Sequence, residues 1–275
     1  MRIDAHQHFW NYEPAQYPWI RPHWPIRRSF LPPDLQPLLA HAKLYGCVAV
    51  QARQTLEESR WLLSLTTQHP FIKGVVGWVD LRSEHVADQL AQLRRHPRLV
   101  GVRHIVQNEP DDSFMLRPDF LRGIGALQAF ALVYDILIFA RQLPAAIQLV
   151  RRFPHQRFVL DHIAKPEIAV QRLSPWAEHI RQLAQYPNVV CKVSGMVTEA
   201  DWKNWAPGHF RPYLDTIFEA FGPARLMYGS DWPVCLLAAS YPRVYDLAAD
   251  YCARLSSGEQ ELVFGGTAQR FYRLH

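Results

Sequence analysis

The chain has 275 residues, of which 49% are hydrophobic and 20% are charged, and its formal net charge is +5. This length suits one (β/α)8 barrel, which takes about 250 residues, and the composition excludes a disordered or low-complexity chain. The basic residues are scattered as doublets and form no stripe, which argues against a nucleic-acid-binding protein. We expect one domain over residues 1–275 that acts on a small molecule.

The sequence shows no mark of export or of membrane insertion. It begins Met-Arg-Ile-Asp without an apolar leader, and it has no apolar run of the roughly 18 residues that a membrane helix needs. Its four cysteines lie far apart, without a CxxC pair, which is typical of reduced residues in a core. We therefore expect a cytoplasmic protein with no membrane partner; the sequence does not indicate its oligomeric state.

Short apolar runs alternate with amphipathic segments along the whole chain. The predicted strands are residues 2–9, 47–52, 72–81, 99–106, 132–139, 157–164, 189–195 and 225–232. The predicted helices include Leu56–His69, Glu84–Arg95, Pro144–Arg152, Pro175–Tyr186 and Pro212–Phe221. Eight strands alternating with helices favour an α/β fold of the (β/α)8 TIM barrel type, and no GxGxxG follows the first strand to indicate a dinucleotide-binding fold.

Two connections are too long to be simple turns, residues 10–33 and residues 196–211. Both follow predicted strands, so both should lie at the C-terminal mouth of the barrel, where this fold builds its active sites. Both are rich in aromatic residues, among them Trp10, Trp19, Trp24 and Trp202. A tryptophan in such a loop is as often packing as it is an apolar face for a ligand.

Ionisable and amide side chains interrupt the predicted strands. They are Asp4, His6, His8, Gln51, Arg103, His104, Asp135, Asp161, His162, Lys192 and Asp231. A polar side chain in a buried strand must be hydrogen-bonded, paired or bound to a metal. Since side chains alternate along a strand, we expect Asp4, His6 and His8 to share one face, and only one of Asp161 and His162 to point inward. We place His162 inward, and the same choice between Arg103 and His104 stays open.

The combination is more specific than any one residue. An HxH pair on one strand face is a suitable chelate, and a third histidine with a carboxylate would complete a zinc site. His6 and His8 supply the pair, His162 lies at a later strand end, and Asp231 stands in GSDWP at the last one.

These motifs resemble those of the amidohydrolase superfamily, whose barrels carry HxH on the first strand and an aspartate on the eighth. The resemblance covers nearly the whole chain through IDAHQHFW, VQA, GVRH, VLDHIAKP, CKVSGMVTEADW, YGSDWPV and FGGTAQRFY. It is strongest with the sugar-lactonase branch, which includes L-fuconolactonases and L-rhamnonolactonases; the VTEADW segment favours the former, and so a role in L-fucose degradation. Pyrone dicarboxylate lactonases are more distant.

The resemblance implies hydrolysis of a sugar lactone, an L-fuconolactone or a related aldonolactone. Asp231 would activate water, and His6, His8 and His162, or one zinc ion held by His6, His8 and Asp231, would polarise the carbonyl. No bridging lysine or additional strand histidine is found that would make a two-metal site, and a metal-independent reaction stays open. Side chains expected to bind the substrate are Gln51, Arg103 or His104, Asp135, Trp10 and Trp232.

Two other activities fit the same barrel. A 2-pyrone-4,6-dicarboxylate lactonase would need two or more cationic side chains in the pocket, and only Arg103 is a clear candidate. A zinc-dependent decarboxylase would release CO2 instead of opening a lactone. A barrel kept only for binding explains poorly why aspartates and histidines gather at the strand ends.

Overall fold

The computed structural model describes all residues 1–275 and contains one eight-stranded sheet. The strands are β1 (Ile3–Gln7), β2 (Gly46–Val50), β3 (Ile72–Gly77), β4 (Leu99–His104), β5 (Val133–Ile136), β6 (Phe158–Leu160), β7 (Val189–Val193) and β8 (Leu226–Tyr228). They lie in sequence order and pair in parallel from β1 to β8. A parallel bridge between Gln7 and Trp232 brings the last strand to the first and closes the ring. The predicted TIM barrel is confirmed.

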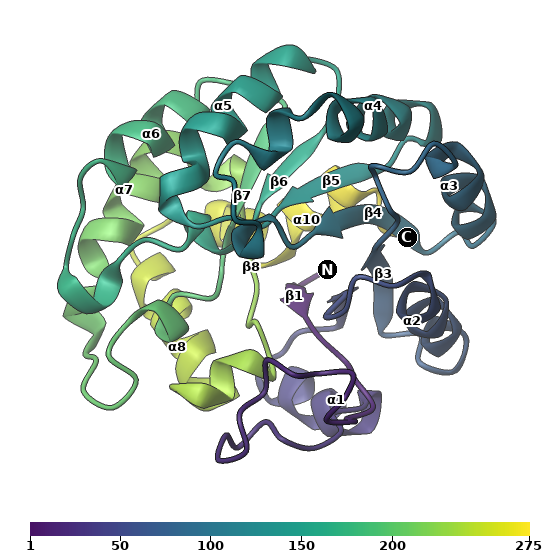
Figure 1. Cartoon of the computed structure of the whole chain (residues 1–275). Helices are drawn as coiled ribbons and strands as arrows, with labels where there is room; N and C mark the ends of the chain where they lie inside the picture. The colour runs from purple at the N-terminus through teal and green to yellow at the C-terminus, as the bar shows by residue number, and fades with distance from the viewer.

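Helices surround the strands, as Figure 1 shows. They are α1 (Pro32–His41), α2 (Leu56–Gln68), α3 (Val86–Arg94), α4 (Pro118–Leu127), α5 (Leu143–Arg152), α6 (Trp176–Leu183), α7 (Arg211–Phe221), α8 (Tyr241–Cys252), α9 (Ser257–Glu261) and α10 (Thr267–Tyr272). The five helices expected from periodicity are present, with ends that shift by up to three residues. Thr55 caps α2 by accepting from the backbone N–H of Glu58 at 3.1 Å. No helix is both long and apolar enough to cross a bilayer.

Two apolar layers hold the barrel together. The inner one fills the barrel with a side chain or two from each strand, such as Ile3, Val133 and Met227, and the outer one packs the strands against the helices. The inner layer also includes Tyr272, the last residue of α10, and Leu274, which follows it. The C-terminal segment therefore covers the end of the barrel opposite the C-terminal mouth. Branched aliphatic residues dominate the inner layer, as expected for a packed barrel interior.

A β-bulge in β1 decides which side chains face inward. Ile3 pairs with Gly46 and Asp4 with Cys47, but Gln7 pairs with Ala49, so β1 holds one extra residue between Asp4 and Gln7. Asp4 therefore points outward, where its carboxylate accepts from the Tyr241 hydroxyl of α8 at 3.0 Å. The expectation that Asp4 shares a face with both histidines is wrong for this reason.

The strands end earlier than predicted at the C-terminal mouth of the barrel. His8, His162 and Asp231 all lie just beyond the last residue of their strands, whereas the sequence placed them inside. The segment from His162 to Lys165 has four consecutive left-handed φ angles, between 46° and 61°. Non-glycine residues rarely adopt this region, and such backbone gathers at functional sites.

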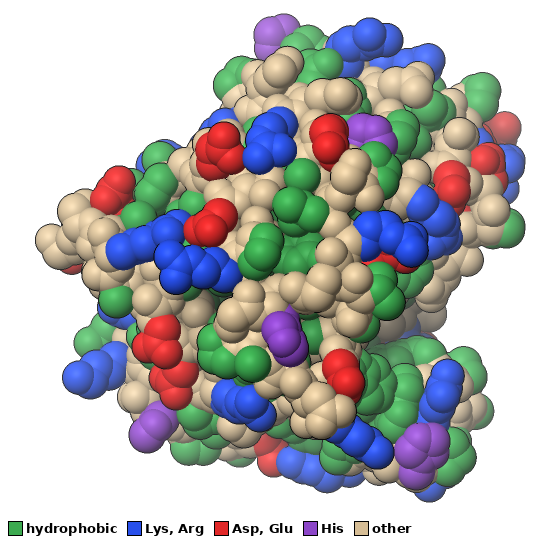
Figure 2. Space-filling view, turned by 90° about the vertical axis from the view of Figure 1, so that its left-hand side faces the viewer, with side chains coloured by type: hydrophobic (Ala, Val, Ile, Leu, Met, Phe, Trp, Pro, Cys, Tyr) green, Lys and Arg blue, Asp and Glu red, His purple; other side chains and the backbone are tan.

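The surface carries both charge signs intermixed. Figure 2 shows Lys and Arg side chains beside Asp and Glu side chains over the face it presents, with apolar groups between them. No continuous basic stripe runs across that face. The distribution agrees with the scattered basic doublets of the sequence.

Candidate active site

Three histidines and an aspartate meet at the mouth of the barrel. The Nε2 atoms of His6 and His8 are 3.2 Å apart, and Asp231 Oδ1 lies 3.3 Å from His8 Nε2 and 3.7 Å from His6 Nε2. His162 Nε2 lies 3.8 Å from the same carboxylate oxygen. All four residues are buried. The structure thus brings together the four side chains that the sequence selected as candidates.

Backbone contacts between the first and last strands hold the aspartate in place. The Asp231 N–H donates to the His6 carbonyl at 2.8 Å, and the His8 N–H donates to the Trp232 carbonyl at 2.7 Å. Asp231 has a φ of 57°, a left-handed conformation that aspartate and asparagine tolerate better than most residues. The turn after β8 therefore aims the carboxylate back toward the histidines of β1.

Two glycines make room for the imidazole rings. A Cβ on Gly195 would lie 2.5 Å from His162 Nδ1, and Gly195 also has a φ of 61°. A Cβ on Gly229 would lie 2.6 Å from the Cβ of His6. Only glycine allows the backbone to pass this close to the two rings.

Each imidazole has a partner on its second nitrogen. His8 Nδ1 lies 2.8 Å from the Val50 carbonyl, which can only accept, so this nitrogen carries a proton and Nε2 is free when the ring is neutral. His162 Nδ1 lies 2.9 Å from the Ser194 hydroxyl. These contacts fix the orientation of both rings toward Asp231.

Burial and neighbouring charges set the protonation of the group. Burial lowers the pKa of His162 to about 4, and burial together with the Lys192 charge lowers that of His6 well below its ordinary value. Burial alone would raise the pKa of Asp231, but the neighbouring His162, His8 and His6 side chains hold it below its ordinary range. At neutral pH the site therefore holds an ionised aspartate beside neutral His6 and His162.

The cluster opens into a cavity of about 320 Å3. The expected residues Trp10 and Arg103 line it, together with His8, His162 and Asp231. Both long connections contribute, the first through Trp19 and Trp24 and the second through Thr198, Glu199 and Trp202. The rings of Trp24 and Trp202 meet with centroids 5.6 Å apart, so the two connections touch over the cavity.

Other expected substrate-binding residues lie elsewhere. His104 is outside the cavity, bonded to Glu109 at 2.7 Å and stacked on Phe114, which leaves Arg103 as the inward member of that pair. Gln51 exchanges hydrogen bonds with Arg103 beneath the cavity. Asp135 lies deeper, on Lys192, and Trp232 packs against Phe9 and Phe30. None of these four lines the cavity.

The position of Asp161 contradicts the expectation, drawn from strand alternation, that only one of Asp161 and His162 points inward. Its carboxylate points inward, 3.0 Å from Arg103 Nη1, 2.9 Å from Lys192 Nζ and 3.4 Å from His6 Nδ1. His162 also faces the site, so both neighbours reach the centre of the barrel. β6 ends at Leu160 and the left-handed turn follows, which places the next side chain on the same side. Alternation holds only while a strand continues.

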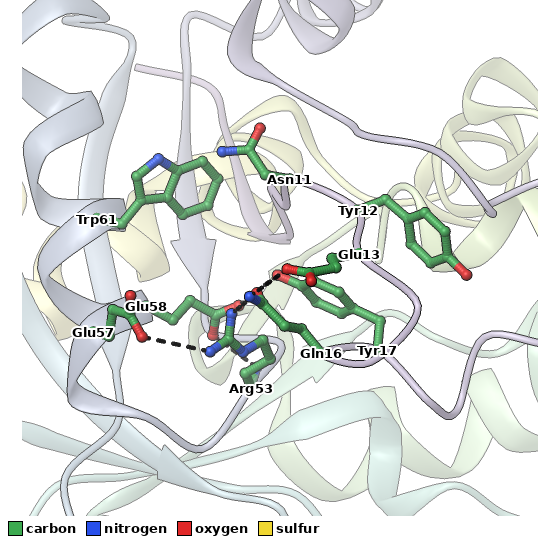
Figure 3. A pocket seen from close by; sticks show the side chains of 9 residues that line it. All are labelled: Asn11, Tyr12, Glu13, Gln16, Tyr17, Arg53, Glu57, Glu58 and Trp61. Carbon is green, nitrogen blue, oxygen red and sulfur yellow. Dashed lines mark hydrogen bonds and ion pairs between the residues drawn. The ribbon is translucent and has the colours of Figure 1, made fainter.

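A second cavity, of about 530 Å3, lies between the first connection and α2 (Figure 3). The Tyr17 hydroxyl donates to Glu58 Oε1 at 3.2 Å, and Glu58 Oε2 accepts from the backbone N–H groups of Ala52 and Arg53 at 2.9 and 2.7 Å. Arg53 in turn contacts Gln16 and Glu57. These contacts fasten the first connection to α2.

A family model described as amidohydrolase matches residues 3–274. The chain belongs to the amidohydrolase family. A curated relative from Burkholderia multivorans, named L-fucono-1,5-lactonase, is 44% identical over 100% of this chain and 96% of its own length. A second protein of that name, from Burkholderia ambifaria, is 39% identical over 99% and 96%.

Solved structures agree with this assignment. An amidohydrolase of Burkholderia multivorans with bound zinc has a TM-score of 0.97 and 45% identity, with all of both chains covered. A probable 2-pyrone-4,6-dicarboxylic acid hydrolase of Acinetobacter baumannii has a TM-score of 0.79 at 17% identity, with 99% of both chains covered. The latter likeness shows the shared amidohydrolase barrel alone.

The donor set of this amidohydrolase fits a single divalent ion. His6, His8 and Asp231 present one ligand atom each, with separations of 3.2, 3.3 and 3.7 Å. Ligands about 2.0–2.1 Å from a tetrahedral zinc ion are about 3.3 Å apart, so the triangle has the right size. Two imidazoles and a carboxylate are also the ligand types of catalytic zinc sites that keep one position open.

Sequence reasoning missed several residues of the amidohydrolase site. Lys192 is fully buried at the base of the histidine cluster, while Lys165 and Glu199 line the cavity as an ion pair of 3.5 Å. A lysine inside the apolar run VVCKV was a signal, but nothing in the sequence gave it a role. Lys165 and Glu199 lie in turns, where no periodicity shows which way a side chain points.

Proposed function

We propose that this protein hydrolyses a sugar lactone to the sugar acid, with L-fucono-1,5-lactone as the substrate. The observation that carries the proposal is the ionised Asp231 set among three buried imidazoles, at a cavity that Asp231, His8 and His162 line. The names of two full-length relatives support the reaction and the substrate.

Asp231 acts as the general base. Its carboxylate takes a proton from a water molecule, whose oxygen attacks the lactone carbonyl, and the protonated carboxyl then gives that proton to the ring oxygen as the C–O bond breaks. General acid–base catalysis of this kind contributes about 10²- to 10⁴-fold to a rate. The neighbouring imidazoles hold the pKa of this carboxylate below its ordinary range, so it is ionised at neutral pH and can accept the proton.

The carbonyl oxygen gains negative charge as water adds. Arg103 lines the cavity and its Nη1 lies 3.4 Å from His6 Nε2, so it offers positive charge beside the histidines. His162 is held by Ser194 with its Nε2 toward the reacting groups. A divalent ion held by His6, His8 and Asp231 would, when bound, polarise the same carbonyl.

The cavity walls suit a polyhydroxylated ring. Lys165 and Glu199 offer donors and acceptors to hydroxyl groups, and burial raises the pKa of Glu199 above its ordinary value. Trp19, Trp24 and Trp202 present aromatic faces above them. We expect the ring hydroxyls to form hydrogen bonds with Lys165 and Glu199, and the apolar face of the sugar to pack against the tryptophans.

A panel of sugar 1,4- and 1,5-lactones, followed with a pH indicator, tests the proposal. Each turnover releases a carboxylic acid, so hydrolysis appears as acidification, and we expect the highest kcat/KM with L-fucono-1,5-lactone. Running the panel with and without a chelator shows whether hydrolysis requires a bound metal, independently of which lactones are hydrolysed. A protein that opens no lactone in the panel, loaded with zinc or free of it, would disprove the proposed function.

A further inference from the structure

Beneath the histidine cluster lies a buried group of charges, of which Lys192, Asp135 and Asp161 have no direct part in the proposed reaction. Lys192 Nζ contacts Asp135 Oδ2 at 2.5 Å and Asp161 Oδ1 at 2.9 Å, and Arg103 Nη1 contacts Asp161 Oδ2 at 3.0 Å. The Tyr272 hydroxyl donates to Asp135 Oδ2 at 2.7 Å. Two cations thus balance two carboxylates in a region that has almost no contact with solvent.

His6 is the residue at which this group meets the site. Its Nδ1 lies 3.1 Å from Lys192 Nζ and 3.4 Å from Asp161 Oδ1. An ammonium group can only donate a hydrogen bond and a carboxylate can only accept one. The same ring nitrogen therefore has a donor and an acceptor beside it, one for each neutral tautomer of the imidazole.

His6 Nε2 also has acceptors and a donor beside it, since His8 Nε2 and Asp231 Oδ1 can accept a proton and Arg103 Nη1, 3.4 Å away, can donate to a free lone pair. With Nδ1 accepting from Lys192, Nε2 carries the proton and can donate to His8 Nε2 at 3.2 Å, which is free because His8 Nδ1 faces the Val50 carbonyl. With Nδ1 donating to Asp161, the Nε2 lone pair is open toward His8 and Asp231, as a metal ligand requires. The two arrangements differ in which ring nitrogen carries the proton, and the ring is neutral in both.

We propose that Lys192 and Asp161 are positioning residues that hold His6 in either of two tautomers, the first for the metal-free site and the second for the metal-bound one. The inference rests on the proposed function only in taking His6 as part of the active site. A histidine that binds a metal commonly donates its other N–H to a carboxylate, and loss of that partner lowers metal affinity by about 10- to 100-fold. Asp161 is the carboxylate placed to do this, and Lys192 and Arg103 keep it ionised and oriented.

Nitrogen-15 NMR of the ring-labelled full-length protein reads the tautomer of His6 directly, with the resonance assigned by its loss in His6→Gln. We expect the proton on Nε2 in chelator-treated protein and on Nδ1 after addition of one equivalent of zinc. The same tautomer in both samples, or no uptake of zinc, would overturn the proposal. This measurement needs no variant of the charged group.

Asp161→Asn tests the acceptor, because an amide is a weaker acceptor of the same size. We expect its zinc affinity, measured by competition with a chelator of known affinity, to fall about 10- to 100-fold. The matched control is Asp4→Asn, since Asp4 is equally buried and accepts from the backbone N–H of His6 but not from its ring. That variant should lose stability and keep the zinc affinity of the unaltered protein within about twofold.

The outcomes separate this inference from the proposed function. If Asp161→Asn folds and keeps its zinc affinity, Asp161 is a structural residue and the proposal fails. If the tautomer changes with zinc while no lactone is hydrolysed, the positioning role stands and the proposed reaction is wrong. If Asp161→Asn does not fold, the NMR comparison of the unaltered protein with and without zinc still shows whether the tautomer of His6 changes.

Discussion

The backbone N–H of Asp231 donates to the carbonyl of His6 at 2.8 Å, across a sequence separation of 225 residues. This bond belongs to the contact that closes the barrel between its first and last strands. The same contact sets the distance between the carboxylate and the two imidazoles of β1. Closure of the fold and assembly of the site are therefore one event.

Replacing Asp231 with asparagine should lower kcat for lactone hydrolysis by about 10²- to 10⁴-fold, because an amide cannot take a proton from water. Asparagine tolerates the left-handed backbone at this position, so the fold should persist, as circular dichroism would show. Asp250→Asn, on the exposed side of α8, is the control and should keep full activity. An active Asp231→Asn enzyme would remove Asp231 from its proposed role.

Zinc at about 100 times its Kd should stabilise the folded protein by about 2.7 kcal/mol, since only the folded chain brings the three ligands together. For a protein of this size that corresponds to a rise in Tm of about 5–10 °C. His8→Gln should abolish the rise, which differential scanning calorimetry would measure. His104→Gln changes a buried histidine outside the cavity and should keep it. An equal rise in both variants would place the ion elsewhere.

Gly195→Ala should reduce both stability and kcat. The new methyl group would lie 2.5 Å from His162 Nδ1, and the positive φ adds strain of about 1–3 kcal/mol. Urea denaturation and steady-state kinetics would measure the two effects. Gly125→Ala, inside α4 with its nearest neighbour at 3.6 Å, should leave kcat unchanged and stabilise the helix slightly. Equal behaviour of the two variants would argue against close packing at His162.

Glu58 should make the protein less stable as the pH rises from about 5 to 8. Burial raises its pKa in the folded protein from 4.5 to about 7, so folding favours the protonated form, and this advantage is lost as the pH rises through that range. Because of this group, the free energy of unfolding should fall by about 2–3 kcal/mol between the two pH values. In Glu58→Gln this part of the pH dependence should be absent. Urea titrations at the two pH values would measure it. Glu57→Gln, with 85% of its side chain exposed, should keep the full pH dependence.

The barrel and the four central side chains could be predicted from the sequence because both follow simple rules. Buried parallel strands are continuous apolar runs, so an aspartate or histidine at their ends stands out, as His6, His8, His162 and Asp231 do. Their meeting at one mouth follows from the parallel arrangement of the strands.

The errors arose where the backbone departs from a regular strand. A bulge between Asp4 and Gln7 turned Asp4 to the outer face, and the left-handed turn after β6 let Asp161 and His162 both face inward. The bulge contains no glycine or proline, and the left-handed turn has only Pro166 immediately after it, which does not show which way Asp161 points. The role of Lys192 could not be predicted either, because it depends on three partners from β1, β5 and the end of β6.

The contact between the first and last strands also limits what a partial chain can do. Residues 1–220 contain seven strands and three histidines of the site, yet the proposed base, Asp231, comes from the end of the eighth strand. Contacts between such distant parts of a sequence form slowly because the loop they close is long. During refolding, the far-ultraviolet circular dichroism of helix and strand should therefore recover before enzyme activity. The delay between the two signals measures how long the first and last strands take to pair.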